Sequence, residues 1–120
     1  IVSVGSQRDV RPYLAASDAF VFPSYREGFP NVVLEAGAMG LACIVTDING
    51  SNEIIIPGEN GEIIPPRDEN ALYNKMKEWV EQPEKVSAMA AKSRELVAGR
   101  YEQKLVWEAL LEEYKRLENL

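Results

Sequence analysis

Short, continuously apolar runs alternate with segments of helical spacing in the first half of the chain. Residues 19–23 (AFVFP) and 41–46 (LACIVT) are the two clearest runs, and residues 31–39 between them have apolar side chains at helical spacing. Continuous hydrophobicity is typical of strands that are buried on both faces of a sheet. A strand–helix–strand order joins parallel neighbours by right-handed crossovers. The pattern therefore predicts a parallel sheet covered by helices.

The other expected elements complete an α/β fold. We expect a strand at residues 1–5 and a short helix at 8–17. Residues 54–56 and 63–64 flank a glycine-rich turn, as two short strands or as a strand and its lead-in. Three helices are expected at residues 68–81, 84–98 and 103–120, with Asp68 capping the first and Gly99 ending the second. The predicted class is a single Rossmann-like domain over residues 1–120, with helices on both faces and a helical C-terminus.

Composition excludes several kinds of chemistry. The 120 residues allow one domain, and their net charge of −6 argues against nucleic-acid binding. The absence of histidine excludes Ser-His-Asp and Cys-His catalysis and any His-containing zinc site. The one cysteine, Cys43, forms no internal disulfide and is expected to be buried within its apolar run. An acidic chain without a signal peptide or an apolar run of about 18 residues suggests a cytoplasmic protein.

Two polar loops, residues 24–30 and 47–53, follow the buried strands. In open parallel sheets, ligands bind outside the carboxyl ends of the strands. A helix that starts near Asn31 offers free N–H groups and the positive end of its dipole to a phosphate. Glu27 and Glu35 flank this helix start, and carboxylates there accept hydrogen bonds from sugar hydroxyls. The combination indicates a nucleotide sugar, although two such glutamates also occur on ordinary solvated surfaces.

One stretch resembles the motif of glycosyltransferase family 4, which comprises retaining nucleotide-sugar transferases with the two-domain GT-B fold. The matching segments are FPS at residues 22–24, EGFP at 27–30, EA at 35–36 and Gly40. The family's E-x7-E motif falls on Glu27 and Glu35. The resemblance continues through residues 49–53, 58–61 and 100–101, and so covers nearly the whole chain.

The resemblance implies a role for each matching residue. Glu35 would accept the ribose hydroxyls of the nucleotide, and Glu27 would contact the donor sugar and face the reacting centre. Backbone amides around four residues would hold the sugar oxygens and the diphosphate: Gly28, Phe29, Asn31 and Val32. Gln7 is expected to frame the base, whereas Glu53 either ties its loop to the helix start or takes part in function.

The chain also departs from the family pattern. Gly37 stands where the family usually has Met, and Ala42 where it has Pro, which puts local rigidity in doubt. The family's acceptor-binding domain, and the Arg and Lys that neutralise the leaving diphosphate, have no counterpart in these residues. The fragment alone is therefore expected to be inactive, and the sequence reads as a piece of a longer protein.

The resemblance further implies retaining transfer from a UDP-, GDP- or ADP-linked sugar without a metal or other cofactor. It allows peripheral association of the longer protein with a membrane. A non-catalytic, regulatory nucleotide-binding module stays open as an alternative. A phospho-acceptor domain lacks its aspartate cluster, and a dinucleotide-binding half lacks G-x-G-x-x-G. The last helix carries an apolar stripe from Val106 to Leu117, which either packs into the core or favours self-association.

Overall fold

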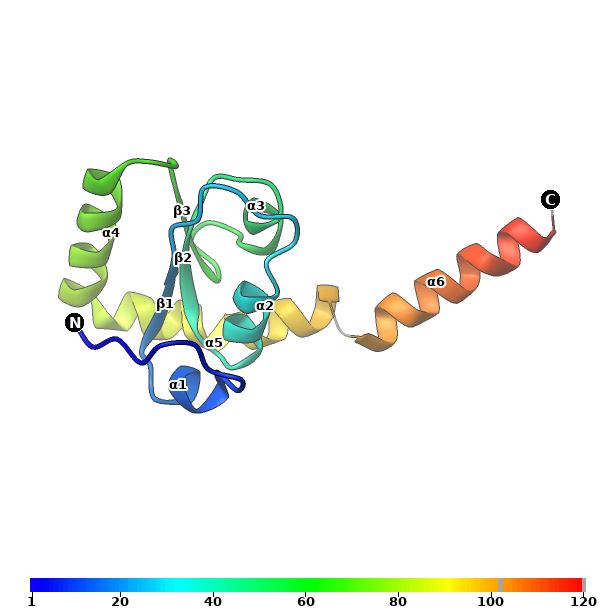
Figure 1. The fold of residues 1–120 in the computed structure, drawn as a ribbon, viewed down its shortest axis with the longest axis horizontal. Helices are drawn as coiled ribbons and strands as arrows, with labels where there is room; N and C mark the ends of the chain where they lie inside the picture. The colour runs from blue at the N-terminus through cyan, green and yellow to red at the C-terminus, as the bar shows by residue number, and fades with distance from the viewer. Residues whose placement is uncertain (102, 120) are drawn as a thin grey trace.

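The computed structural model describes residues 1–101 and 103–119, and its centre is a parallel sheet. The strands are β1 (Ala19–Phe22), β2 (Ala42–Thr46) and β3 (Gly61–Ile64), in the order β1-β2-β3. Ala19 lies opposite Ala42, and Cys43 opposite Gly61. All three strands run in one direction, so their carboxyl ends meet at one edge of the sheet, at the top in Figure 1.

The described part of the chain has six helices, of which five lie around the sheet and the last projects beyond it. They are α1 (Arg11–Ala15), α2 (Asn31–Ala38), α3 (Ser51–Ile54), α4 (Glu69–Glu81), α5 (Pro83–Tyr101) and α6 (Gln103–Glu118). The predicted cap of α4 is confirmed, since the Asp68 side chain accepts a hydrogen bond from the Ala71 N–H at 2.9 Å.

The central strand β2 divides the core into two clusters. Cys43 and Val45 pack with residues of α1, α2 and α3, including Leu14, Val33 and Ile54. Ala42 and Ile44, which alternate with them, pack on the opposite face with residues of α4 and α5, among them Trp79, Val86 and Met89. Every residue of β2 is buried, so the prediction of a strand covered on both faces is confirmed for β2.

Strand β1 is less covered than its apolar sequence predicts. All four of its residues are half-buried, because β1 pairs with β2 along one edge only within the described residues. Residues 1–5 form no strand, and Ile1 and Val2 are fully exposed. A strand requires a neighbour for its N–H and C=O groups, and this segment pairs with no strand in the part of the chain described. The predicted first strand is therefore wrong.

Two further boundaries differ from expectation. Residues 54–56 are not a strand: Ile54 ends α3, which begins at Ser51 within the predicted loop 47–53. The buried Asn60 side chain takes the place of a neighbouring strand, since it donates to the Ile54 carbonyl at 3.1 Å and accepts from the Ile56 N–H at 2.7 Å. Gly99 does not end α5, which continues to Tyr101 because that residue is anchored to the body.

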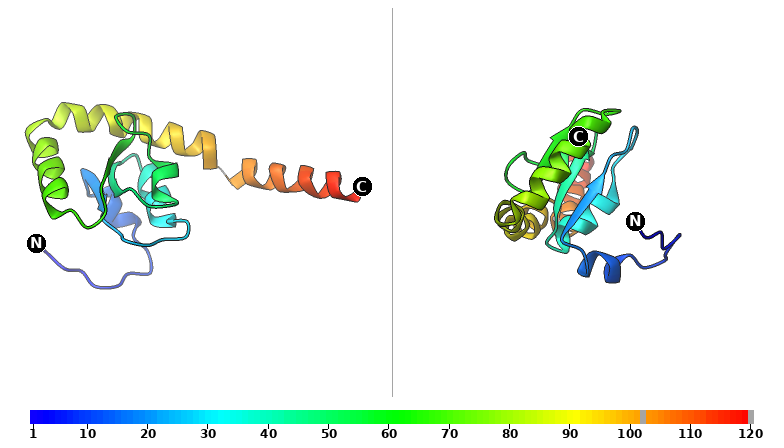
Figure 2. Two further views of the ribbon diagram at one scale, coloured as in Figure 1. Left: turned by 90° about the horizontal axis from the view of Figure 1, so that it is seen from above. Right: turned by 90° about the vertical axis from the view of Figure 1, so that its left-hand side faces the viewer.

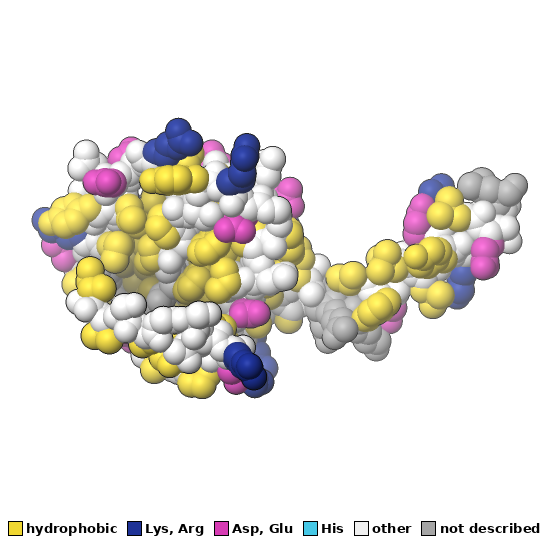
Figure 3. All heavy atoms as spheres, viewed as in Figure 1, with side chains coloured by type: hydrophobic (Ala, Val, Ile, Leu, Met, Phe, Trp, Pro, Cys, Tyr) yellow, Lys and Arg dark blue, Asp and Glu magenta, His cyan; other side chains and the backbone are white. Residues whose placement is uncertain are grey.

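Helix α6 projects away from the α/β body (Figures 1 and 2). Its apolar side chains are exposed, with Trp107 at 62% and Tyr114 at 66%, so the expectation of core packing for this stripe is wrong. Figure 3 shows hydrophobic side chains along this helix. Among the described residues, no helix combines the length and apolar character needed to cross a membrane.

Candidate functional site

The two loops at the carboxyl ends of β1 and β2 contact each other. The Thr46 hydroxyl, at the end of β2, donates a hydrogen bond to the Ser24 carbonyl of the first loop. Gly50 of the second loop has φ +88°, and a Cβ on it would lie 2.6 Å from the Gly28 carbonyl oxygen and 2.8 Å from Pro30 Cδ. The close fit requires glycine at residue 50. The predicted meeting of these loops at one edge of the sheet is observed.

Glu27 lies on the exposed part of the first loop. Its carboxylate accepts a hydrogen bond from the Ser24 hydroxyl, with 2.9 Å between Ser24 Oγ and Glu27 Oε1. Ser24 is thus attached to Thr46 through its carbonyl and to Glu27 through its hydroxyl. This arrangement orients one carboxylate oxygen, while the other has no partner among the residues that the structure describes and can accept hydrogen bonds from a ligand.

The start of α2 leaves backbone donors available. Pro30 is the N-cap and provides no side-chain hydrogen bond, while its carbonyl accepts from the Val33 N–H at 3.0 Å. Within the described chain, the N–H groups of Asn31 and Val32 have no acceptor. The Val32 side chain packs against the core, so the part of this residue available to a ligand is its backbone N–H. Free amides at a helix start attract an anion.

Glu35 lines a groove between α2 and α5. The groove has a volume of about 770 Å³, and Asn31 and Glu35 line it from α2. Arg94 and Tyr101 line it from α5. The structure therefore places Glu35 and Asn31 in one groove, whereas Glu27 lies outside that groove on the preceding loop.

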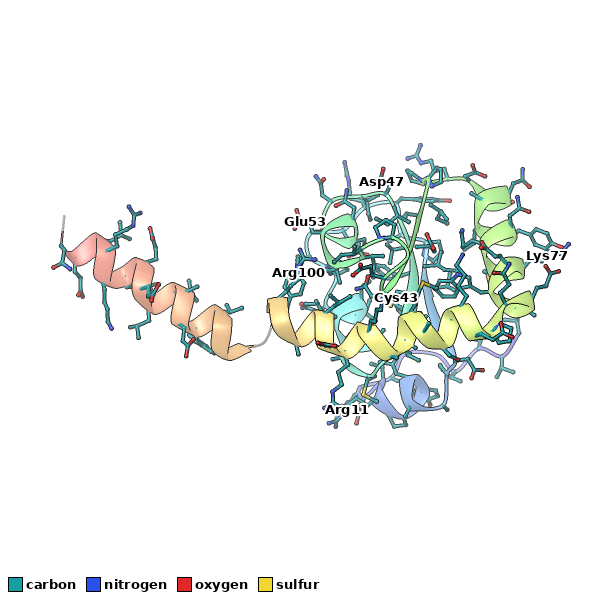
Figure 4. The ribbon with its side chains drawn as sticks, turned by 180° about the vertical axis from the view of Figure 1, so that it is seen from behind. Arg11, Cys43, Asp47, Glu53, Lys77 and Arg100 are labelled. Carbon is teal, nitrogen blue, oxygen red and sulfur yellow. The ribbon has the colours of Figure 1, made fainter. Side chains whose placement is uncertain are left out.

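Tyr101 connects the last turn of α5 to both loops. Its ring contacts that of Phe29, with 5.6 Å between centroids, and its hydroxyl donates to the Glu53 carbonyl at 3.1 Å. The Arg100 guanidinium lies 5.1 Å from the centre of the same ring. Figure 4 shows Glu53 and Arg100 at the end of the body from which α6 projects. The contact of Glu53 is made by its backbone and goes to α5, so the role of its side chain stays a prediction.

A smaller pocket, of about 140 Å³, lies where the three strands end. Pro23, Thr46 and Ile64 line it from the ends of β1, β2 and β3. Tyr25 from the first loop and Arg67 from the turn before α4 form another part of its wall. The guanidinium carbon of Arg67 is 5.4 Å from the centre of the Tyr25 ring.

The resolved pKa shifts lie away from these loops. Hydrogen bonds from Lys75 and then Lys85 lower the pKa of Glu78 to about 2. Burial raises the pKa of the Cys43 thiol to about 12, so this thiol stays protonated and unreactive in the core. No group of three or more Cys, Asp or Glu side chains in the described residues is arranged to hold a metal ion.

Three contributors to the site were missed by the sequence analysis: Arg94, Tyr25 and Arg67. Arg94 belongs to a helix whose sequence pattern predicts only packing, and no local signal connects it with Glu35, which is 59 positions earlier. Gln7 does not follow a strand as expected; its side-chain amide donates to the Val4 carbonyl at 2.6 Å in an exposed segment. Its predicted position at a strand end is wrong.

Comparison with solved structures first defines the class. Sucrose-phosphate synthase from Thermosynechococcus elongatus superposes with a TM-score of 0.85 at 29% identity, covering 92% of this chain and 28% of that protein. Anabaena HepE in complex with UDP superposes with a TM-score of 0.86 at 22% identity, covering 92% and 30%. The fold is that of the GT-B glycosyltransferases.

Sequence comparison then gives the family. The family model described as "Glycosyl transferases group 1" matches residues 1–82, and the chain belongs to this family. A Campylobacter jejuni N,N'-diacetylbacillosaminyl-diphospho-undecaprenol α-1,3-N-acetylgalactosaminyltransferase is 33% identical over 95% of this chain. A Staphylococcus aureus capsular polysaccharide glycosyltransferase, CapM, is 30% identical over 78%. The chain spans 30% and 24% of these two relatives' lengths.

Proposed function

We propose that this chain is the donor-binding part of a retaining glycosyltransferase that uses a nucleotide-diphosphate sugar. The observation that supports this most is the meeting of the two loops through Gly28 and Gly50. This contact holds the start of α2 against the second loop, and Glu27 precedes that start by four residues, whereas Glu35 follows it by four. That arrangement suits one ligand class, because the amides bind phosphate oxygens and the carboxylates bind hydroxyls.

Each residue then has a defined role in donor binding. Glu35 accepts hydrogen bonds from the ribose hydroxyls in the groove between α2 and α5, and Glu27 accepts them from the donor sugar. The amides of Gly28, Phe29, Asn31 and Val32 hold sugar and diphosphate oxygens. These roles, the E-x7-E assignment and membership of family 4 are extended to the chain from the resemblance.

The proposed chemistry needs no protein nucleophile. The acceptor attacks on the same face of the donor sugar from which the diphosphate leaves, and a departing phosphate oxygen takes the acceptor's proton. Catalysis depends on positioning and on stabilising the charge of the leaving group, with the helix-start amides in place of a metal ion. We further propose that a separate domain binds the acceptor, so the 120 residues alone do not transfer sugar.

The first test is titration of the chain with UDP, GDP and ADP, followed by two-dimensional amide NMR. We expect one nucleotide to shift resonances of residues 28–35. Glu35→Ala should abolish these shifts, whereas Glu112→Ala, which removes an exposed carboxylate of α6, should preserve them. Absence of shifts with every nucleotide, both in the folded chain and in the longer protein, would contradict the proposal.

The second test addresses transfer in the longer protein. Glu27→Gln keeps the shape of the side chain but removes its charge, so we expect nucleotide binding to persist while sugar transfer falls by about 100-fold or more. Product stereochemistry, read by NMR, tests retention. A protein that binds the nucleotide but neither transfers nor hydrolyses the donor would instead be the non-catalytic module.

A further inference from the structure

Arg67 has a backbone conformation that its side chain disfavours. Its φ is +59°, and it alone among the non-glycine residues described has a positive φ. The left-handed region is uncommon for residues with a Cβ, and glycine adopts it without this penalty. Strain of this kind persists where the surrounding structure enforces it, often at functional sites. The cost of this conformation therefore indicates that the Arg67 side chain makes a contact that glycine cannot make.

The side chain reaches across the end of the sheet. Arg67 follows β3, whereas Tyr25 follows β1, and β2 lies between these two strands. The separation of 5.4 Å between the guanidinium carbon and the ring centre is within the range of a cation–π contact. Both residues line the 140 Å³ pocket at the end of β2. The contact thus joins two loops that are far apart in sequence.

The loop attached in this way carries Glu27. Tyr25 lies two residues before Glu27, and Ser24, beside Tyr25, donates to the Glu27 carboxylate at 2.9 Å. The Ser24 carbonyl accepts from Thr46. The first loop is therefore held to β2 at Ser24 and to the β3–α4 turn at Tyr25. Further along, Gly28 and Pro30 contact Gly50, and Phe29 contacts Tyr101, so the segment that depends on the Tyr25 attachment is residues 25–27.

We propose that Arg67 and Tyr25 are positioning residues that hold the 24–30 loop so that Glu27 faces the donor sugar. The role of Glu27 in this inference rests on the proposed function, whereas the contact between Arg67 and Tyr25 does not depend on it. Arg67 acts through Tyr25 and does not contact the sugar.

Variants of the pair separate positioning from stability. Arg67→Gly removes the guanidinium and also relieves the backbone strain, so we expect a melting temperature no lower than that of the wild type. Tyr25→Leu removes the ring, whereas Tyr25→Phe and Arg67→Lys keep an aromatic face and a cation. Lys77→Ala removes an exposed cation of α4 as a matched control.

The first readout is the amide ¹⁵N order parameter of residues 25–27 in the 120-residue chain. We expect it to fall from about 0.85 toward about 0.6 in Arg67→Gly and Tyr25→Leu, and to stay unchanged in Lys77→Ala. Tyr25→Phe and Arg67→Lys should stay close to the wild type. Unchanged order in Arg67→Gly would overturn the proposal, whatever the protein's activity.

The second readout is transfer kinetics in the longer protein. A misplaced Glu27 should lower kcat by about fivefold to tenfold with little change in KM for the donor, and Arg67→Lys should restore most of the rate. An ordered loop with unchanged kinetics in Arg67→Gly would overturn the proposal. A wild type that moves no sugar, while the variants still loosen the loop, would refute the proposed function and leave the attachment standing.

Discussion

Gly50 lies at φ +88°, and a Cβ on this residue would point at the loop that contains Glu27. An alanine there would be strained, and its Cβ would also contact the Gly28 carbonyl oxygen at 2.6 Å. We expect Gly50→Ala to lower the free energy of unfolding by about 2–4 kcal/mol and to separate the loops. Urea unfolding measures the first effect, and nucleotide titration the second.

The control for this substitution is Gly58→Ala. Gly58 also has a positive φ, but no heavy atom lies within 4 Å of the position of its Cβ. Its substitution therefore carries the backbone strain without the loop contact. Equal losses of nucleotide binding in the two variants would contradict a specific role for Gly50.

At the residue scale, the surroundings of a side chain are predictable where its neighbours along the chain decide them. Cys43 stands in an apolar run and is completely buried, as predicted. The motif and the position near a helix start predict Glu27 and Glu35 as site residues. Arg67 could not be found in this way, because its partner, Tyr25, lies 42 residues away across an intervening strand.

At the scale of elements, α2 and α5 approach closely at Gly37. A Cβ at this position would lie 2.6 Å from Val97 Cγ2 and 3.4 Å from Ser93 Oγ. We expect Gly37→Ala to destabilise the fold by about 1–2 kcal/mol, since the overlap outweighs the gain in helix propensity. Thermal unfolding of the purified chain measures the change.

A second substitution tests whether this contact is the cause. Val97→Ala removes the contacting methyl groups, so Gly37→Ala should cost less in that background than in the wild type. The difference is the coupling energy of a double-mutant cycle. Additive effects would contradict the explanation by overlap.

Helices α4 and α5 are joined by an ion pair that predicts a pH dependence. Glu78 contacts Lys75 at 2.8 Å within α4 and Lys85 of α5 at 2.6 Å. The pKa of Glu78 is lowered from 4.5 to about 2, so its stabilising contribution is present above pH 4.5 and is lost as the pH falls toward 2. Because all three side chains are partly exposed, we expect no more than about 1 kcal/mol.

Urea unfolding of the wild type and of Glu78→Gln measures this contribution. The difference between the two free energies of unfolding should be largest near pH 7 and should shrink between pH 4.5 and pH 2. A difference that stays constant over this interval would show that the carboxylate charge contributes nothing.

The elements that were predicted correctly are those whose sequence patterns indicate which of their faces are buried. β2 is apolar throughout because both of its faces are covered, and α4 begins at an Asp cap followed by an amphipathic run. Residues 1–5 and 54–56 are also apolar, but a strand depends on an available partner, which local sequence does not reveal. For residues 54–56 the Asn60 side chain replaces that partner.

At the scale of the whole molecule, apolar surface is unevenly distributed, and α6 carries a row of exposed apolar side chains. Its exposed apolar residues are Val106, Trp107, Leu110, Leu111, Tyr114 and Leu117. Apolar surface of this extent favours association. We expect the 120-residue chain to form dimers at high concentration, as measured by sedimentation equilibrium.

Replacing two apolar residues of α6 by glutamate should prevent this association. Trp107→Glu together with Leu111→Glu should shift the chain to monomers without changing its melting temperature, because these side chains lie outside the core. Glu112→Gln is the matched control on the same helix. A wild-type chain that stays monomeric at all concentrations would contradict the expectation.

The absence of a Cβ at Gly37 also limits which residues relatives can carry at this position. The separation of α2 and α5 at Gly37 sets the width of the groove that Glu35 and Arg94 share. Relatives with a larger residue at this position must hold the two helices further apart or carry a smaller residue at position 97. The identities at these two positions should therefore covary, and together they should record how wide the groove is in each relative.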